Sequence, residues 1–184
     1  MVITVLFVQG AGDMHQPDGS IHLARYLERE LGDGYRIIAP EMPDAEENPS
    51  YEPWSRAIER ELAAIEGPVV VVGHSLGGSI VLKMLAESRR PAAISALFLA
   101  SMPWWGPEGW DFAEYAPAEG FATRLPDIPV FLYHSIDDPH VPIAHLQLYE
   151  AALPHAEIRR IPGAEHSFVN GLPVLVGDIE GIPV

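Results

Sequence analysis

The chain has 184 residues, no cysteine and a formal net charge of −15 at neutral pH. Its hydrophobic content of 48% fits a single globular domain over residues 1–184 and is too high for a disordered chain. Without cysteine there can be no disulfide framework, thiolate metal site or cysteine nucleophile. The negative charge argues against nucleic acid or an anionic membrane as a partner and favours neutral or cationic small molecules.

No apolar run reaches the length of about 20 residues that spans a bilayer. The apolar start at residues 1–8 is short for a signal peptide and has no basic residues, so it predicts a buried strand. We therefore expect a cytoplasmic protein without membrane contact, either a monomer or a small homo-oligomer.

Short runs rich in Val, Ile and Leu alternate with amphipathic segments, which is typical of a parallel sheet with helices on both faces. The predicted strands are residues 3–8, 35–39, 69–72, 93–100, 130–134 and 157–160. The predicted helices are residues 20–31, 51–65, 76–87, 143–152 and 173–180. This order predicts an α/β fold, a three-layer α/β/α sandwich around a mainly parallel sheet of about six strands.

The segment 101–125 breaks this alternation. It is rich in proline and aromatic residues, among them Trp104, Trp105 and Trp110. Long irregular loops in compact domains often carry function, so the segment is either a lid-like loop or a packed cluster over a sheet end. We expect Trp104 and Trp105 to bind substrate by lining an apolar pocket for a short acyl or aromatic group.

Residues 73–77 match the pattern G-x-S-x-G, in which a serine occupies a sharp turn between a strand and a helix. The context agrees, because the four valines 69–72 precede the motif and an amphipathic run follows it. Glycines flank the turn because side chains there would collide. The motif predicts Ser75 as a nucleophile; the alternative is a glycine-rich turn with an inert serine.

A serine nucleophile needs a base, which in this chain order follows an acidic residue. His166 comes after the last predicted strand and is the expected base. Asp138 follows the predicted strand 130–134 and precedes a proline, so we expect it to be the acid that orients His166. Asp137 is expected to cap the turn or face solvent.

The chain has eight histidines, and most need no catalytic role. His74 is expected to be structural and to point away from the substrate side. His134 and His140 flank the acid and either support it or are ordinary loop residues. The remaining four are interpreted as surface or partly packed residues: His15, His22, His145 and His155. Their spacings match no metal template, so no metal is predicted.

Hydrolysis of an acyl group also needs two N–H donors for the oxyanion. We expect the backbone N–H groups of Leu76 and Ala11 to supply them, with Gly12 the next choice. Ala11 lies in a glycine-rich loop that follows the first strand, and Gln9, Gly10 and Gly12 of this loop are expected to contact substrate. The two glycines are also half of a dinucleotide fingerprint, but the third glycine and the acidic partner are absent.

Together these motifs resemble the α/β-hydrolase superfamily, and within it the small capless serine hydrolases of the retinoblastoma-binding-protein type, including YdeN-like members. The resemblance rests on residues 10–12, 40–43, Trp54, 73–77, 137–142 and 163–168. It implies a minimal fold with little or no cap, a Ser75–His166–Asp138 triad and no cofactor. The chain departs from the pattern at Gln9, where many members have histidine.

The resulting functional hypothesis is hydrolysis of small carboxylic esters or related acyl compounds through an acyl-enzyme. We expect bulky or polyanionic substrates to be excluded. Two alternatives keep the same triad, namely a perhydrolase and a carbon–carbon bond hydrolase. A third is a non-catalytic interaction domain on a hydrolase scaffold.

Overall fold

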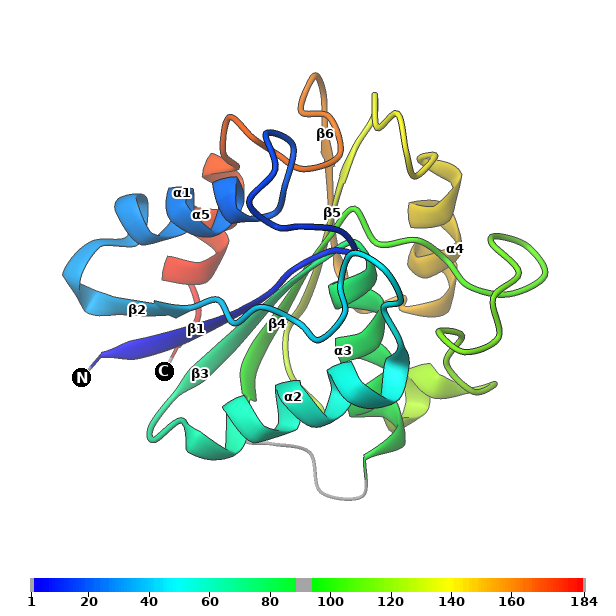
Figure 1. Cartoon of the computed structure of the whole chain (residues 1–184), viewed down its shortest axis with the longest axis horizontal. Coiled ribbons are helices and arrows are strands. Elements are labelled where there is room, and N and C mark those ends of the chain that lie inside the picture. Colours follow the sequence, from blue (N-terminus) through cyan, green and yellow to red (C-terminus); the bar gives the residue numbers. More distant parts are fainter. Residues whose placement is uncertain (1, 89–93, 184) are drawn as a thin grey trace.

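A six-stranded parallel sheet runs through the computed structural model, which describes residues 2–88 and 94–183 (Figure 1). The strand order is β2-β1-β3-β4-β5-β6, and every neighbouring pair is parallel. The strands are β1 (Ile3–Val8), β2 (Tyr35–Ile38), β3 (Val69–His74), β4 (Ile94–Ala100), β5 (Val130–Ser135) and β6 (Glu157–Ile161). All six predicted strands are confirmed with small shifts at their ends; Ala93, predicted to begin the fourth, lies outside the described residues.

Five helices cover the two faces of the sheet, as predicted. The helices α1 (Ile21–Leu31) and α5 (Pro173–Glu180) lie on one face (Figure 1). The other face is covered by α2 (Tyr51–Ala64), α3 (Leu76–Glu87) and α4 (Ala144–Ala152). Two short 3-10 turns complete the described elements, η1 (Gly32–Gly34) and η2 (Phe121–Arg124). The three-layer α/β/α sandwich is therefore confirmed.

The valines of β3 explain why this strand lies in the interior. Val69 and Val71 pack toward α2 and α3, whereas Val70 and Val72 pack toward α1 and α5. Successive side chains of a strand point to opposite faces, so a continuous valine run suits a strand that is buried on both sides.

Parallel strands bring their carboxyl ends to one edge of the sheet, where ligands of open α/β sheets bind. The loops after β1, β3, β5 and β6 therefore meet at this edge, and they carry the predicted catalytic residues. We use the name β1 loop for residues 9–13 and β6 loop for residues 162–167.

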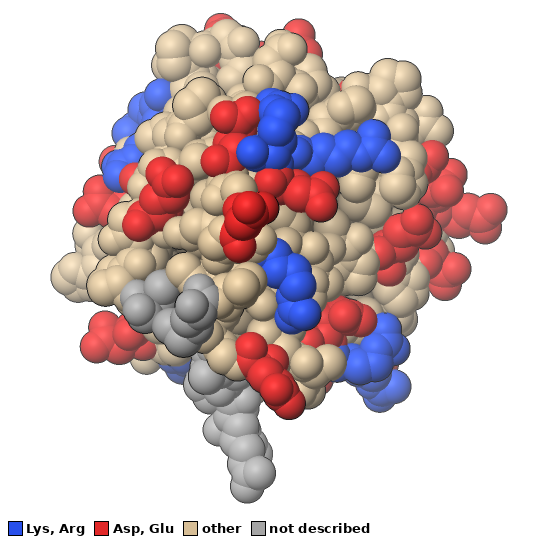
Figure 2. Space-filling view, turned by 90° about the vertical axis from the view of Figure 1, so that its left-hand side faces the viewer, with Lys and Arg blue, Asp and Glu red and all other residues tan. Residues whose placement is uncertain are grey.

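Acidic side chains are spread over the face drawn in Figure 2, and basic side chains lie among them rather than forming one continuous patch. Among the described residues, no helix combines the length and apolar character that crossing a membrane requires.

Candidate active site

Ser75 occupies the sharp turn between β3 and α3, with φ 50° and ψ −123°. A non-glycine residue in this region is strained, so its surroundings must hold it there. A Cβ added to Gly77 would lie 2.1 Å from the carbonyl oxygen of Gln9, and one added to Gly73 would lie 2.6 Å from Cα of Gly78. Only glycine fits at these two positions, which is the steric reason predicted from the sequence.

His166 approaches Ser75 from the β6 loop. Its Nε2 lies 3.1 Å from Oγ of Ser75, which is hydrogen-bond distance for accepting the serine proton. The preceding residue, Glu165, has φ 51°, so this loop also holds a strained residue beside the imidazole.

Asp138 holds the other side of the imidazole. Its Oδ2 lies 2.8 Å from Nδ1 of His166, and its Oδ1 accepts hydrogen bonds from the backbone N–H groups of His140 and Val141. Burial raises the pKa of Asp138, but the hydrogen bonds from His166, Val141 and His140 outweigh that effect and lower the pKa to about 2. The carboxylate is thus ionised and fixed in orientation.

The neighbouring carboxylate of Asp137 has a different task. It is exposed, and its Oδ2 accepts a hydrogen bond of 2.8 Å from the backbone N–H of Gly163. Asp137 therefore ties the loop after β5 to the β6 loop, and among the described residues it makes no hydrogen bond or ion pair with the imidazole of His166.

The N–H groups of Gly10 and Gly12 in the β1 loop are engaged by other parts of the chain, whereas among the described residues that of Ala11 is not. Gly10 N–H donates to Oγ of Ser20 at 2.9 Å, and Gly12 N–H donates to the carbonyl of Ala45 at 2.7 Å. Within residues 2–88 and 94–183, the N–H groups of Ala11 and Leu76 have no hydrogen-bond partner. These are the two donors predicted from the sequence, while Gly12 is already engaged.

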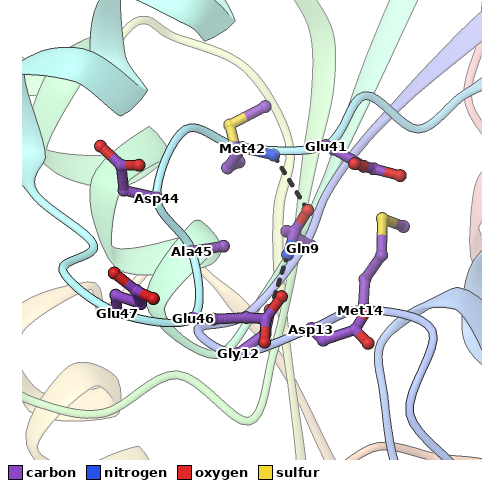
Figure 3. Close-up of a pocket in the computed structure, with 10 residues that line it drawn as sticks. All are labelled: Gln9, Gly12, Asp13, Met14, Glu41, Met42, Asp44, Ala45, Glu46 and Glu47. Atoms are coloured by element: carbon purple, nitrogen blue, oxygen red, sulfur yellow. Dashed lines mark hydrogen bonds between the residues drawn. The ribbon is translucent and has the colours of Figure 1, made fainter.

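The side chain of Gln9 forms hydrogen bonds with the backbone of the β1 loop and of Met42 (Figure 3). Its Oε1 accepts from the N–H of Met42 at 3.0 Å, and its Nε2 donates to the carbonyl oxygens of Gly12 and Gly10 at 3.1 and 3.3 Å. With both ends of the amide engaged and 2% of the residue exposed, Gln9 shapes the loop. Its predicted contact with substrate has no support from this geometry.

A cavity of about 320 Å³ opens at Ser75 and His166. Most of its lining is polar or glycine, and it includes Gly10, Ala11, Gly12, Asp13, Met14, Gln16, Asp18, His140 and Ser167. A volume of this size suits a small molecule. Gly10, Ala11 and Gly12 thus lie where substrate contact was predicted.

Trp104 and Trp105 are not among the residues that line this cavity. The backbone N–H of Trp104 donates to Nδ1 of His145 at 2.8 Å, and the indole ring of Trp104 packs edge-on against Tyr149 of α4. The ring of Trp105 lies 4.8 Å from that of Tyr115. The expected tryptophan lining is therefore not found at this cavity, because the two rings pack on other aromatic side chains, Trp104 also on Phe121 and Trp105 also on Trp110 and Phe112. Substrate binding by Trp104 and Trp105 stays a prediction.

A second pocket of about 330 Å³ adjoins the first and shares Gly12, Asp13 and Met14 with it. Its side chains include five carboxylates, those of Asp13, Glu41, Asp44, Glu46 and Glu47 (Figure 3). Among the described residues, no group of three or more His, Asp or Glu side chains is arranged to hold a metal ion. Both pockets therefore lie in an acidic part of the surface.

Four further histidines surround the site. His134 is buried, its Nε2 donates to the carbonyl of Val141 at 2.8 Å, and burial lowers its pKa. The exposed ring of His140 lies 5.2 Å from that of His166. His145 is buried, so of the two expectations for it the packed one holds, and its Nδ1 accepts a hydrogen bond from the backbone N–H of Trp104. His74 is 3% exposed and belongs to the cavity lining, contrary to the prediction that it points away.

The comparison with known proteins agrees with the observed fold. Residues 5–123 match the alpha/beta hydrolase family. The chain belongs to this family. In fold it is similar to the ydeN gene product of B. subtilis, with 18% identity, a TM-score of 0.78 and coverage of 98% of this chain and 97% of that one.

Two other solved structures show the same fold. A YdeN-like hydrolase from Pectobacterium atrosepticum has 20% identity and a TM-score of 0.61, with coverage of 90% of this chain and 80% of that one. The meta-cleavage product hydrolase from Pseudomonas fluorescens has 14% identity and a TM-score of 0.74, with coverage of 98% and 91%. No curated protein matches the chain in sequence. The family and these hydrolase neighbours support hydrolytic activity for this α/β hydrolase.

Proposed function

We propose that this α/β hydrolase is a serine hydrolase that cleaves small carboxylic esters or related acyl compounds. The observation that carries the proposal is the continuous arrangement of Ser75, His166 and Asp138, with contacts of 3.1 Å and 2.8 Å on the two sides of the imidazole. An ordinary serine hydroxyl is a poor nucleophile, and a base oriented by a carboxylate is what activates it.

In the acylation step, Oγ of Ser75 attacks the carbonyl carbon while Nε2 of His166 takes the hydroxyl proton. Asp138 keeps Nδ1 of His166 protonated and stabilises the imidazolium that forms. The N–H groups of Ala11 and Leu76 stabilise the oxyanion. The imidazolium then gives its proton to the leaving alcohol, which leaves an ester on Ser75.

In the deacylation step, water takes the place of the alcohol. His166 removes a proton from the water, the resulting hydroxyl attacks the acyl carbon, and the proton passes to Oγ of Ser75. The carboxylic acid product leaves and the starting state is restored. These steps use the chain's own groups, water and substrate.

The cavity favours small substrates that are neutral or cationic. Asp13 and Asp18 line the cavity at Ser75, and the adjoining pocket adds further carboxylates. Such surroundings repel a polyanion at low ionic strength. A cytoplasmic location and a monomeric or small homo-oligomeric state stay predictions.

A substrate panel with purified protein tests this proposal. The panel contains p-nitrophenyl esters of increasing acyl length, with and without peroxide, and a carbon–carbon cleavage substrate. We expect turnover of the short esters that is lost in Ser75→Ala. Turnover that requires peroxide indicates a perhydrolase, and cleavage confined to the carbon–carbon substrate indicates the other alternative. A folded protein without any turnover contradicts the proposal.

A further inference from the structure

A chain of buried and partly buried hydrogen bonds runs from the β1 loop to the β6 loop beside Ser75. Gly10 N–H donates to Oγ of Ser20 at 2.9 Å, and Oγ of Ser20 lies 2.8 Å from Nδ1 of His74. On the other side of the same ring, Nε2 of His74 lies 3.0 Å from the carbonyl oxygen of His166. The ring of His74 thus bridges two loops that the sequence separates widely.

The direction of each hydrogen bond follows from the chemistry of its partners. The carbonyl oxygen of His166 can only accept, so Nε2 of His74 carries the proton. A neutral imidazole then has Nδ1 as its acceptor, so the hydroxyl of Ser20 donates to it. Burial lowers the pKa of His74 to about 3, and the neutral ring keeps this arrangement throughout the neutral range.

The carbonyl oxygen of His166 accepts a second hydrogen bond. Oγ of Ser101, which is fully buried at the end of β4, donates to the carbonyl oxygen of His166 at 2.8 Å. Ser101 has φ 51°, a strained value that persists only where the surroundings hold it. The backbone of His166 is therefore fixed by Ser101 from one side and by His74 from another.

Gly10 of the β1 loop packs closely against both His74 and Ser75. A Cβ added to Gly10 would lie 3.1 Å from Nδ1 of His74 and 3.1 Å from Cβ of Ser75. Ser20 fixes the N–H of Gly10, so the next N–H, that of Ala11, stays free for the proposed oxyanion. A shift at Ser20 would therefore change the position of the proposed donor.

We propose that His74 is a positioning residue that couples the β1 loop to the backbone of His166, so that the oxyanion donor and the base are aligned together. This inference rests on the proposed serine-hydrolase function. It extends that function to a residue whose ring lies 5.0 Å from the ring of His166 but whose nitrogens are engaged by Ser20 and by the backbone carbonyl of His166 rather than by the imidazole of His166 or by Ser75.

The test is a double-mutant cycle with Ser20→Ala and Ser101→Ala, which remove hydroxyl groups at opposite ends of the network. The readout is the kinetics of labelling by a fluorophosphonate, separated into probe affinity and the rate constant of the covalent step. Misplacing reacting groups by an ångström costs up to about 100-fold in rate. We expect each single substitution to lower the covalent rate constant by about 10- to 100-fold with probe affinity little changed.

The coupling is measured by how the two effects combine. If the two losses were independent, the rate constant of the double variant would follow from multiplying them. We expect the measured rate constant of the double variant to be at least about 5-fold higher than that value. In a His74→Ala background the two losses should simply multiply. The network proposal is overturned if the losses multiply in both backgrounds, or if they fail to multiply in both.

Two further variants keep the test decisive. His74→Phe keeps a ring of similar size but has neither a donor for the carbonyl of His166 nor an acceptor for Ser20, so it replaces His74→Ala as the uncoupled background if that variant does not fold. Ser79→Ala is the matched control, because Ser79 is a similarly buried serine, 2% exposed, whose hydroxyl donates to the carbonyl of Pro103 instead. We expect labelling of Ser79→Ala at the wild-type rate, and a loss like that of Ser20→Ala would mean that any buried serine matters.

A readout that needs no activity separates this inference from the proposed function. In the nuclear magnetic resonance spectrum, Ser101→Ala should shift the backbone amide signal of Gly10, and this shift should vanish in the His74→Ala background. A wild-type protein that is not labelled contradicts the serine-hydrolase proposal. An unchanged Gly10 signal contradicts the coupling through His74, whether or not the protein is labelled.

Discussion

Nδ1 of His166 lies 2.8 Å from Oδ2 of Asp138, whose side chain is fully buried. Asp137, the adjacent carboxylate, is exposed and accepts its hydrogen bond from the backbone of Gly163. Two consecutive aspartates therefore have separate tasks. One orients the candidate base, and the other ties two loops together.

Asp138→Asn should lower kcat by about 10⁴-fold, because an amide cannot hold His166 in the tautomer that accepts the serine proton. Asp137→Asn is the matched control. Its amide oxygen still accepts from the N–H of Gly163, so we expect kcat within about 3-fold of the wild type. Steady-state kinetics on the best ester of the panel measures both, and the opposite ranking would show that Asp137 is the acid.

Ser75→Gly should be more stable than Ser75→Ala, by about 1 kcal/mol in the free energy of unfolding. The reason is the φ of 50° at this position, which glycine adopts without strain and alanine does not. Both variants should lose turnover. Urea unfolding measures the difference, and a less stable glycine variant would show that the turn is not strained.

Gly77→Ala should destabilise the protein by about 3 kcal/mol, because the new Cβ would meet backbone oxygens that cannot move aside. The nearest, the carbonyl oxygen of Gln9, lies 2.1 Å away. Gly177→Ala in α5 is the control, since nothing lies within 4 Å of its added Cβ. There the helix gains about 1 kcal/mol. Thermal and urea unfolding compare the two, and equal effects would contradict the tight packing of the elbow.

The stability that His74 contributes should fall as the pH falls. Burial lowers its pKa from 6.5 to about 3, so below pH 6.5 the unfolded chain binds a proton that the folded protein does not. The free energy of unfolding of the wild type should therefore fall more steeply than that of His74→Gln, by about 1 kcal/mol per pH unit below pH 6. Surface carboxylates are common to both proteins and cancel. Urea unfolding from pH 7 to pH 5 provides the comparison, and parallel curves would contradict a neutral buried imidazole.

Most of the fold and the residues of the candidate triad could be predicted from local sequence patterns. The valines of β3 predicted a strand that is buried on both faces, and the glycines around Ser75 predicted the turn, because both depend on neighbours in sequence. Asp138 and His166 could be predicted because parallel strands end at one edge of the sheet, so position along the chain translates into position at that edge.

The contacts between distant segments could not be predicted in this way. His145 is buried, and its Nδ1 accepts a hydrogen bond from the backbone N–H of Trp104; no local pattern links these two residues. The same contact joins the aromatic segment to α4, where the ring of Trp104 also packs on Tyr149, and no tryptophan is among the described residues that line the cavity at Ser75. The bridge from Ser20 through His74 depends on three segments that meet only in the folded protein.

The most direct test of the central claim is the intact mass of the protein after treatment with a fluorophosphonate probe. We expect one adduct per chain, located at Ser75 by peptide mapping, and no adduct on Ser75→Ala or His166→Ala. A folded wild-type protein that stays unmodified, or an adduct on another residue, would contradict the assignment of Ser75 as a nucleophile activated by His166.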